Sequence, residues 1–446
     1  MTSRCALALL AVLPLLPASA RHPSACRTFV VARAGVSHAD ATTIQAAVDQ
    51  ARPCDSILIA PGVYREAVVI RTQHLLLRGL DRNRVVLDGG HRVGSGIRIM
   101  GVNDVSIENL TVRNFDRASL NDDEHGAQIW WQRVQGWHGS YLTVYETGLL
   151  GGYGLYALRA ERGRWDHVYA SGFNDAGLYI GACRNCLATV SHAVAERNAV
   201  GYAGSNSGGD LVVEDSLFRD NAIGLTANST ESDPPPPQLG SCAAGANRNA
   251  TPTISSTAIA RCTIFRRNRV VANNNLSVPS DTAGVRPGWG VGIVLLGTYA
   301  DLFADNEVVA NRNVGILALE FPYPPLARRH VVQFQLSGNR FDRNRISGSK
   351  LDIALEGGLF GSRRSIDNCF SANRYSTSLP HDLRLFDCVH PATPNPPELV
   401  SRQILALVRR LHLVFAARHP RGQPPPSPQP SMPNPCQGLP PDALCP

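Results

Sequence analysis

Residues 154–176 read GLYALRAERGRWDHVYASGFNDA, residues 177–200 read GLYIGACRNCLATVSHAVAERNAV, and residues 201–223 read GYAGSNSGGDLVVEDSLFRDNAI. These segments begin with Gly154, Gly177 and Gly201, at intervals of 23 and 24 residues, and Gly224 opens the next one. A period of about 20 to 50 residues is the signature of a solenoid or array. Each segment alternates apolar and polar residues in short runs broken by Gly, Asn, Asp and Ser, with no helical period. The repeat therefore predicts stacked coils of β-strands.

One coil cannot bury its own apolar face, but coils stacked about 4.8 Å apart pair every strand with its neighbours. We predict an all-β fold, a right-handed parallel β-helix of about 10 to 12 coils over residues 21–398. Its core should contain two columns, one and three residues after each glycine. They are Leu155, Leu178, Tyr202, Leu225, Ile293 and Ile316, and then Ala157, Ile180, Ala227, Leu295 and Ala318.

An asparagine precedes each of three repeat glycines by three residues: Asn174, Asn198 and Asn221. Asparagine tolerates the left-handed conformation of a turn, and its amide can bond the amide of the next coil. We predict that these three residues form one structural ladder.

Both ends of a solenoid need covering, because an open sheet edge pairs with other chains. Residues 40–51, DATTIQAAVDQA, predict an N-terminal capping helix with Thr42 or Thr43 as its N-cap. Residues 399–417 carry a broad apolar stripe beside several arginines and are too short and charged to span a membrane. We expect a C-terminal capping helix there, with a helix lying on a membrane surface as the alternative.

Residues 1–20 have the layout of a signal peptide, with Arg4, an apolar stretch and cleavage after Ala20. We therefore expect a secreted, periplasmic or cell-surface protein. Removal of Cys5 with that segment leaves ten cysteines, which neighbouring pairs can join into five disulfides. The Cys183 and Cys186 pair also has the spacing of a redox or zinc dithiol, but a local disulfide is favoured. The ten are Cys26, Cys54, Cys183, Cys186, Cys242, Cys262, Cys369, Cys388, Cys436 and Cys445.

Two segments depart from the repeat. Residues 229–257 predict a long excursion from the coil wall, and the proline-rich residues 418–446 predict an extended or disordered tail. The net charge of +7 suits an anionic partner such as a polyuronate, and nothing resembles a nucleic-acid-binding module. We expect a monomer.

Several segments carry a resemblance to a known superfamily. TIQAAVDQA and SILIAPGVYREAVVI, at residues 43–51 and 56–70, and then GGYGLY, NDAGLYIGACRNC, ERNAVGYAGSN and DSLFRDNAIGL resemble the pectin-lyase-like superfamily. Within it they are similar to secreted bacterial parallel β-helix repeat proteins. The resemblance implies a right-handed parallel β-helix. It also implies that the activity could be that of a polysaccharide lyase, a polygalacturonase, a methylesterase or a uronate epimerase, since the superfamily includes all of these. The residue blocks of polygalacturonases and alginate epimerases are absent as sets, so no catalytic residue is carried over.

An aromatic face is the first candidate site. If Gly126 is the repeat glycine of its coil, Gln128, Tyr156 and Tyr179 form one outward column, and Trp130 lies two residues farther on. Exposed aromatic rings at coil spacing can hold pyranose rings. The alternative is a stack that only stabilises the sheet surface.

Acidic residues fall near the same edge. Asp123, Glu124 and His125 lie in one turn, and Asp175 has the same offset from its glycine as Glu124. A separation of roughly 10 Å leaves room for a water, near the upper end for inverting glycosidases. We take Asp123, Glu124 and Asp175 as candidate catalytic residues and His125 as a substrate-binding residue. Ca²⁺ binding or a merely solvated turn are the alternatives.

We expect a secreted carbohydrate-binding protein that acts without a recognisable catalytic motif and without a cofactor, apart from possible Ca²⁺. The alternative is a polysaccharide-active enzyme, a lyase, glycoside hydrolase or uronate epimerase.

Overall fold

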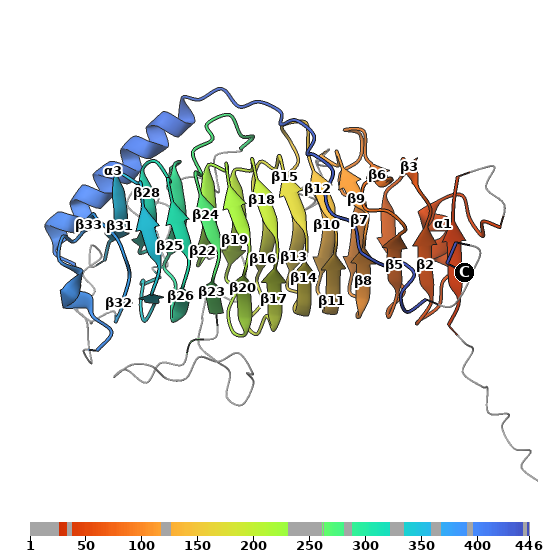
Figure 1. Cartoon of the computed structure of the whole chain (residues 1–446), viewed down its shortest axis with the longest axis horizontal. Helices are drawn as coiled ribbons and strands as arrows, with labels where there is room; N and C mark the ends of the chain where they lie inside the picture. Colours follow the sequence, from red (N-terminus) through yellow and green to blue (C-terminus); the bar gives the residue numbers. More distant parts are fainter. Residues whose placement is uncertain are drawn as a thin grey trace, which may run out of the picture.

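The computed structural model describes residues 26–33, 38–116, 126–230, 261, 263–280, 288–321, 334–357, 367–389, 396–439 and 444–445. The chain is an all-β, right-handed parallel β-helix (Figure 1), as the repeat predicts. Each regular coil contributes one strand to each of three parallel sheets, named sheet A, sheet B and sheet C here. One such coil consists of β14 (Glu161–Asp166) in sheet A, β15 (Tyr169–Ser171) in sheet B and β16 (Ala176–Gly181) in sheet C.

The strands of each sheet follow one another along the axis of the solenoid. Sheet A contains β1 (Thr28–Val31), β2 (Ser56–Ile59), β5 (Leu76–Gly79), β8 (Val105–Glu108), β11 (Gln135–Ser140), β14, β17 (Ala188–Ser191), β20 (Leu211–Glu214), β23 (Thr263–Arg266), β26 (Asp301–Ala304), β29 (Arg340–Asp342) and β32 (Cys369–Ser371). Sheet B contains β3 (Gly62–Tyr64), β6 (Val85–Asp88), β9 (Thr111–Arg113), β12 (Thr143–Tyr145), β15, β18 (Val194–Glu196), β21 (Leu217–Arg219), β24 (Arg269–Val271), β27 (Glu307–Val309) and β30 (Arg345–Ser347). Sheet C contains β4 (Val68–Ile70), β7 (Ile97–Met100), β10 (Ala127–Gln132), β13 (Tyr153–Leu158), β16, β19 (Val200–Ser205), β22 (Ile223–Asn228), β25 (Val291–Leu296), β28 (Val314–Leu319), β31 (Leu351–Leu355) and β33 (Ser378–Leu379).

The predicted core columns are confirmed. Leu155 pairs with Leu178, Leu178 with Tyr202, and Tyr202 with Leu225, and all four are completely buried. The column continues through Ile293 and Ile316 on later coils. The second column is also buried, with Ala157 beside Ile180 and Ala227 beside Leu295.

The repeat glycines have a steric cause. A Cβ placed on Gly154 would lie 2.4 Å from the carbonyl oxygen of Gly177, and one on Gly201 would lie 2.5 Å from that of Gly224. At these two glycines the backbones of neighbouring coils therefore approach too closely for a Cβ atom. The glycine period of the sequence therefore marks positions where the backbones of neighbouring coils lie close together.

Asparagine ladders stabilise the turns. The Nδ2 of Asn198 donates to Oδ1 of Asn221 at 3.0 Å, and the Nδ2 of Asn221 donates to Oδ1 of Asn273 at 2.9 Å. Asn174 does not belong to this ladder, contrary to the prediction; its Nδ2 donates to the carbonyl of Leu149 instead. The turn from β15 to β16 holds one residue more than the turn from β18 to β19, so Phe173 takes the ladder position.

Helical segments close the ends of the solenoid and cover one side of it. Helix α1 (Ile44–Gln50) is capped by Thr43, whose Oγ1 accepts from the backbone N–H of Ala46. At the other end, Leu383 and Phe386 of the 3₁₀ helix η1 (Leu383–Phe386) pack into the core. Helix α3 (Glu398–Ala416) lays its apolar stripe on the outer face of sheet C rather than over that end (Figure 1). Within the described residues, no helix has the length and apolar character to cross a bilayer.

The chain after α3 is extended, which is one of the two conformations expected for it. Residues 418–439 run back along the solenoid to its first coils (Figure 1). The Nη1 of Arg82 donates to the carbonyl of Pro430 at 2.9 Å, and Asn83 exchanges two hydrogen bonds with Gln429. This return segment joins residues almost 350 positions apart in the sequence.

Four disulfides lie within the described residues, each between neighbouring cysteines as expected. They are Cys26–Cys54, Cys183–Cys186, Cys369–Cys388 and Cys436–Cys445. The Cys183–Cys186 pair is thus an oxidised clip and not a free dithiol. Cys242 and Cys262, and most of the 229–257 excursion, lie outside the described residues.

Candidate functional site

The predicted acidic turn with Asp123, Glu124 and His125 lies outside the described residues. Asp175 is described and lies directly before β16. Its Oδ2 accepts a hydrogen bond of 2.6 Å from the hydroxyl of Tyr153. The ring of Tyr153 stacks on that of Tyr156, with centroids 4.2 Å apart.

The predicted aromatic column exists, but with two corrections. Trp130, not Gln128, pairs with Tyr156, and Tyr156 pairs with Tyr179; their ring centroids are 5.5 and 4.8 Å apart. The three rings are only 3 to 4 % exposed and belong to the apolar cluster on the outer face of sheet C. They therefore do not form an exposed surface for sugar rings in this structure.

Gln128 does not belong to the aromatic column, because Gly126 is not the residue of its coil that corresponds to the repeat glycine. In the structure Ala127 pairs with Tyr153 and Ile129 with Leu155, which puts Gln128 itself at the position of Gly154. Its side chain is completely buried and exchanges two hydrogen bonds with the backbone of Phe115. Gln128 therefore supports a turn and is not available to a ligand.

The structure brings together a group of titratable residues that the sequence did not single out. His91, Asp116 and Glu146 follow β6, β9 and β12, so they lie on three successive coils at the edge between sheets B and C. The Nδ1 of His91 is 2.7 Å from Oδ2 of Asp116 and 3.3 Å from Oε1 of Glu146. Its Nε2 is 3.2 Å from Oγ1 of Thr147. We call these three residues the edge cluster.

The two carboxylates of the edge cluster are buried, whereas its imidazole is partly exposed to solvent. The side chain of Glu146 is completely buried and that of Asp116 is 8 % exposed, whereas that of His91 is 41 % exposed. The Oε1 of Glu146 accepts from the backbone N–H of Gly148 at 2.6 Å, and its Oε2 has no hydrogen-bond partner. Solvent and any ligand therefore meet the imidazole first.

Burial and neighbouring charges set the protonation of the edge cluster. Burial, and then the charge of Asp116, raises the pKa of Glu146 to about 7, against hydrogen bonds from Gly148 and Thr147 and the charge of His91. Burial lowers the pKa of His91, but the hydrogen bond to Asp116 and the charges of both carboxylates outweigh it and raise that pKa above its usual value. The edge cluster can therefore bind or release a proton near neutral pH.

Two glycines leave space for the carboxylates of the edge cluster. A Cβ on Gly148 would lie 3.0 Å from Oδ2 of Asp116, and one on Gly151 would lie 2.8 Å from Cγ of Glu146. The only trace of this arrangement in the sequence is the glycine-rich turn ETGLLGG at residues 146–152. His91 and Asp116 are 25 residues apart, the same interval at which β6 pairs with β9, but the glycine period that reveals the central coils does not extend to these coils.

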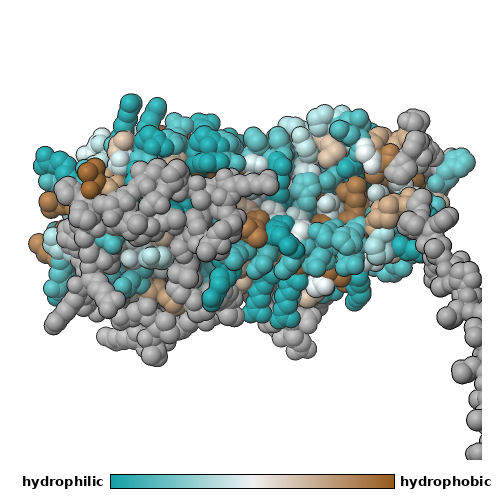
Figure 2. Space-filling model, turned by 90° about the horizontal axis from the view of Figure 1, so that it is seen from below, coloured by the Kyte–Doolittle hydropathy of each residue, from teal (hydrophilic) through white to brown (hydrophobic). Residues whose placement is uncertain are grey.

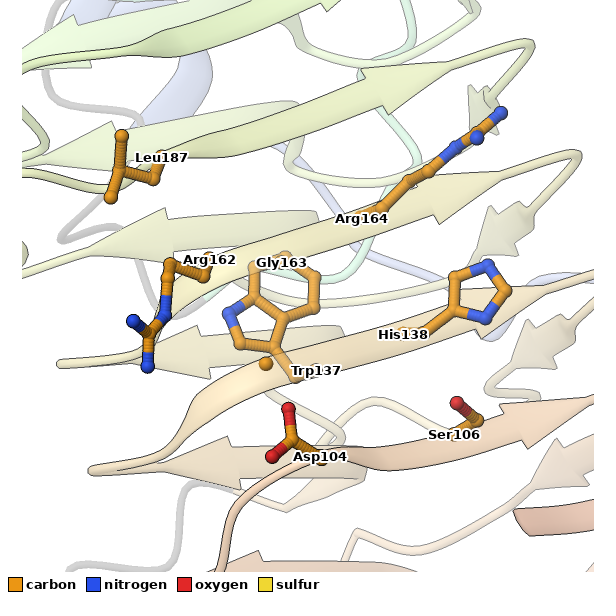
Figure 3. A pocket seen from close by; sticks show the side chains of 9 residues that line it. Asp104, Ser106, Trp137, His138, Arg162, Gly163, Arg164 and Leu187 are labelled. Atoms are coloured by element: carbon orange, nitrogen blue, oxygen red, sulfur yellow. The ribbon is translucent and has the colours of Figure 1, made fainter. Parts of the chain in front are cut away.

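A shallow groove crosses the outer face of sheet A over β8, β11 and β14 (Figure 3). It encloses about 470 Å³, and its polar side chains include Asp104, Ser106, His138, Arg162 and Arg164. The groove carries both signs of charge, because Asp104 faces Arg162 across it in Figure 3 while His138 and Arg164 lie toward its other end. Seen from below, the coloured surface is mostly hydrophilic, with apolar residues in small separate patches (Figure 2).

Comparisons with solved structures agree with the fold. The A-module of the mannuronan C-5 epimerase AlgE4 from Azotobacter vinelandii matches with a TM-score of 0.50 and 14% identity, over 75% of this chain and 91% of that one. The catalytic domain of a GH87 α-1,3-glucanase matches with a TM-score of 0.46 and 10% identity, over 80% and 66%. An alginate lyase from Paenibacillus sp. matches with a TM-score of 0.41 and 14% identity, over 72% and 94%. No family model and no curated protein matches the chain.

The match to the AlgE4 A-module concerns the architecture alone: both chains are right-handed parallel β-helices. At 10 to 14% identity the likeness concerns the fold and leaves the activity to be argued from this chain's own residues.

Proposed function

We propose that this protein is an exported polysaccharide-active enzyme that uses the edge cluster for proton transfer. The observation that carries the proposal is the completely buried Glu146, with one unbonded carboxylate oxygen, beside an exposed His91 that contacts both carboxylates. Cleavage of a glycosidic bond, by hydrolysis or by elimination, needs a group that gives or takes a proton in the transition state.

In the proposed mechanism His91 meets the substrate. Asp116 orients its ring through Nδ1 and stabilises the imidazolium form, while the exposed side of the ring faces solvent. Glu146 holds a second proton near neutral pH and gives it to Nδ1 as the ring gives its Nε2 proton to the substrate, so the ring ends neutral and Glu146 ends as a carboxylate. A polymer can lie along the edge between sheets B and C, because residues of successive coils repeat along it.

Catalysis is favoured over simple binding by one feature. A binding site gains nothing from a buried carboxylate with an unsatisfied oxygen, which costs free energy of folding, whereas proton transfer uses such a group. Non-catalytic carbohydrate binding remains the second candidate. It is supported by the same edge, where Asp175 and Tyr153 add polar groups one coil farther along. The disulfides agree with an exported protein.

The experiment is a screen of the purified protein against polyuronates and neutral glucans. Unsaturated-product absorbance detects elimination, reducing ends detect hydrolysis, and NMR detects epimerisation without cleavage. We expect turnover of at least one polymer. His91→Asn and Glu146→Gln should each lower its rate by at least about a hundredfold, the lower range for general acid–base catalysis.

His138→Asn is the matched control, because His138 is a partly exposed imidazole whose Nδ1 lies 3.2 Å from Oε1 of Glu108 in a similar pair. It should retain the wild-type rate. Binding of a polymer without turnover would establish the second candidate instead. Neither binding nor turnover, or equal rates in all three variants, would refute the proposal.

A further inference from the structure

The return segment, residues 418–439, passes directly beside the edge cluster. A Cβ placed on Gly422 would lie 2.1 Å from the carbonyl oxygen of Thr147, so the backbone of the return segment lies against the turn that follows β12. Thr147 is the residue after Glu146, and its Oγ1 is 3.2 Å from Nε2 of His91. A single residue therefore lies between the return segment and the ring nitrogen that meets the substrate in the proposed mechanism.

A loop of the solenoid meets the return segment at the same place. The backbone N–H of Arg421 and the Nε2 of Gln423 both donate to the carbonyl of Ser277, at 2.8 and 3.0 Å. Ser277 lies in the loop after β24, whereas Gly422 contacts the turn after β12, and β15, β18 and β21 lie between these two strands in sheet B. The loop therefore reaches back along these coils and joins the return segment directly beyond the coil of Glu146.

The middle of the return segment is held only at its two ends. On one side of residues 424–428, Gln423 bonds to Ser277, and on the other side the N–H of Gln429 donates to Oδ1 of Asn83 at 2.8 Å. Residues 424–428 read PPPSP, and proline has no N–H to donate. Within the described part of the chain, these five residues make no hydrogen bond to the solenoid. The middle can therefore lift from the surface when the bonds at its ends open.

We propose that the return segment is an autoinhibitory strap, which lies in the path of a polymer bound at the edge cluster until residues 418–428 are displaced. This inference rests on the proposed function, in which the polymer lies along the edge between sheets B and C. In one of its two directions, a polymer bound at His91 continues over Thr147 toward the coil of β15. The return segment and the loop after β24 lie in that direction.

The closed form still admits a short ligand. With the return segment in place, the side chain of His91 remains 41 % exposed, so a sugar unit can reach the imidazole. What the return segment obstructs is the continuation of a long chain past Thr147. Opening should therefore favour polymers over disaccharides of the same sugars.

Two variants of the full-length, disulfide-bonded protein open the return segment in different ways. Gly422→Ala places a Cβ 2.1 Å from the carbonyl oxygen of Thr147, so the return segment has to move off that turn. Asn83→Ala combined with Gln423→Ala removes the bonds on both sides of residues 424–428 and adds no atom near the edge cluster.

Hydrogen exchange measures the opening without reference to activity. The N–H groups of Arg421 and Gln429 bond to the solenoid in the closed form, and both should exchange faster in the two variants.

Binding of alginate and of polygalacturonate is measured by affinity electrophoresis, beside the rates from the polymer screen. A minor open state is typically populated at about 0.1 to 10 %. Because apparent affinity scales with the populated fraction, full opening should raise polymer affinity by at least about tenfold. Affinity for the disaccharides should stay at the wild-type value in both variants.

Ser427→Ala is the matched control, since Ser427 is an exposed residue of the return segment whose hydroxyl bonds to no other described residue. It should behave as the wild type. His91→Asn added to Gly422→Ala should abolish turnover and keep the gain in polymer binding, which separates a failure of the proposed proton transfer from a failure of this inference.

Three results would overturn the inference. The first is that the opened variants bind and turn over both polymers as the wild type does. The second is that no variant binds either polymer. The third is unchanged hydrogen exchange at Arg421 and Gln429 in both variants, because the return segment is then a fixed part of the fold.

Discussion

Replacement of Asn221 by alanine tests whether the asparagine ladder holds the coils together. The side chain of Asn221 is completely buried. Its Oδ1 accepts from the backbone N–H and the Nδ2 of Asn198, and its Nδ2 donates to the carbonyl of Ala195 and to Oδ1 of Asn273. Alanine removes all four bonds and leaves their partners inside the solenoid.

The expected cost follows from those partners. The N–H of Asn198 loses the acceptor at 2.9 Å, and the carbonyl of Ala195 loses its side-chain donor. A buried polar group left without a partner costs about 1 to 3 kcal/mol. Two such groups, with two further weakened bonds, give a loss of about 3 to 5 kcal/mol in the free energy of unfolding.

The measurement is guanidinium unfolding of the disulfide-bonded protein, followed by circular dichroism. Asn174→Ala is the matched control, because Asn174 lies off the ladder and makes one bond, to the carbonyl of Leu149. We expect the control to lose less than about 1 kcal/mol. Equal losses in the two variants would show that the ladder does not stabilise the fold.

Three further predictions concern other parts of the molecule. Gly201→Ala should prevent folding or cost several kcal/mol, because the added Cβ would lie 2.5 Å from the carbonyl of Gly224; normal unfolding of this variant would contradict the close-packed column. Thiol titration of denatured, unreduced protein should find Cys183 and Cys186 fully oxidised, and two free thiols would restore the dithiol interpretation. Burial, and then a neighbouring glutamate, raises the pKa of Glu356 to about 8, so the native state keeps a proton that the unfolded chain loses above about pH 4.5. The free energy of unfolding should therefore fall as the pH rises from about 4.5 to 8. Glu356→Gln should remove up to about 5 kcal/mol of that loss at pH 8 and above. Identical pH dependence of stability in the wild type and the variant would refute the assignment.

The fold could be predicted because each coil of a solenoid makes the same contacts with the next coil, so the residues at those contacts recur in the sequence at a fixed interval. The central coils meet one another at the same glycine position, so Gly154, Gly177 and Gly201 mark one physical column. The errors arise where a turn changes length. One extra residue moves Asn174 off the ladder, and a longer turn before β10 moves Gln128 into the glycine column.

The candidate site could not be predicted in the same way. His91, Asp116 and Glu146 occupy turns whose lengths differ from coil to coil, so no common offset from a glycine relates them. The pKa values of these three residues depend on burial, and the alternation of apolar and polar residues along a strand does not predict burial in a turn. The aromatic column was predictable as a column, but its burial depends on what packs over sheet C, and that is a tertiary property.

The pH–rate profile of the wild type and of Glu146→Gln on a polymer found in the screen tests the central claim most directly. If Glu146 supplies the proton that His91 transfers, wild-type kcat/KM should fall as the pH rises through about 7, the pKa to which burial raises that carboxyl. The variant should be slower by at least about a hundredfold and should lack this limb. A variant with the wild-type rate and the same limb near pH 7 would contradict the account.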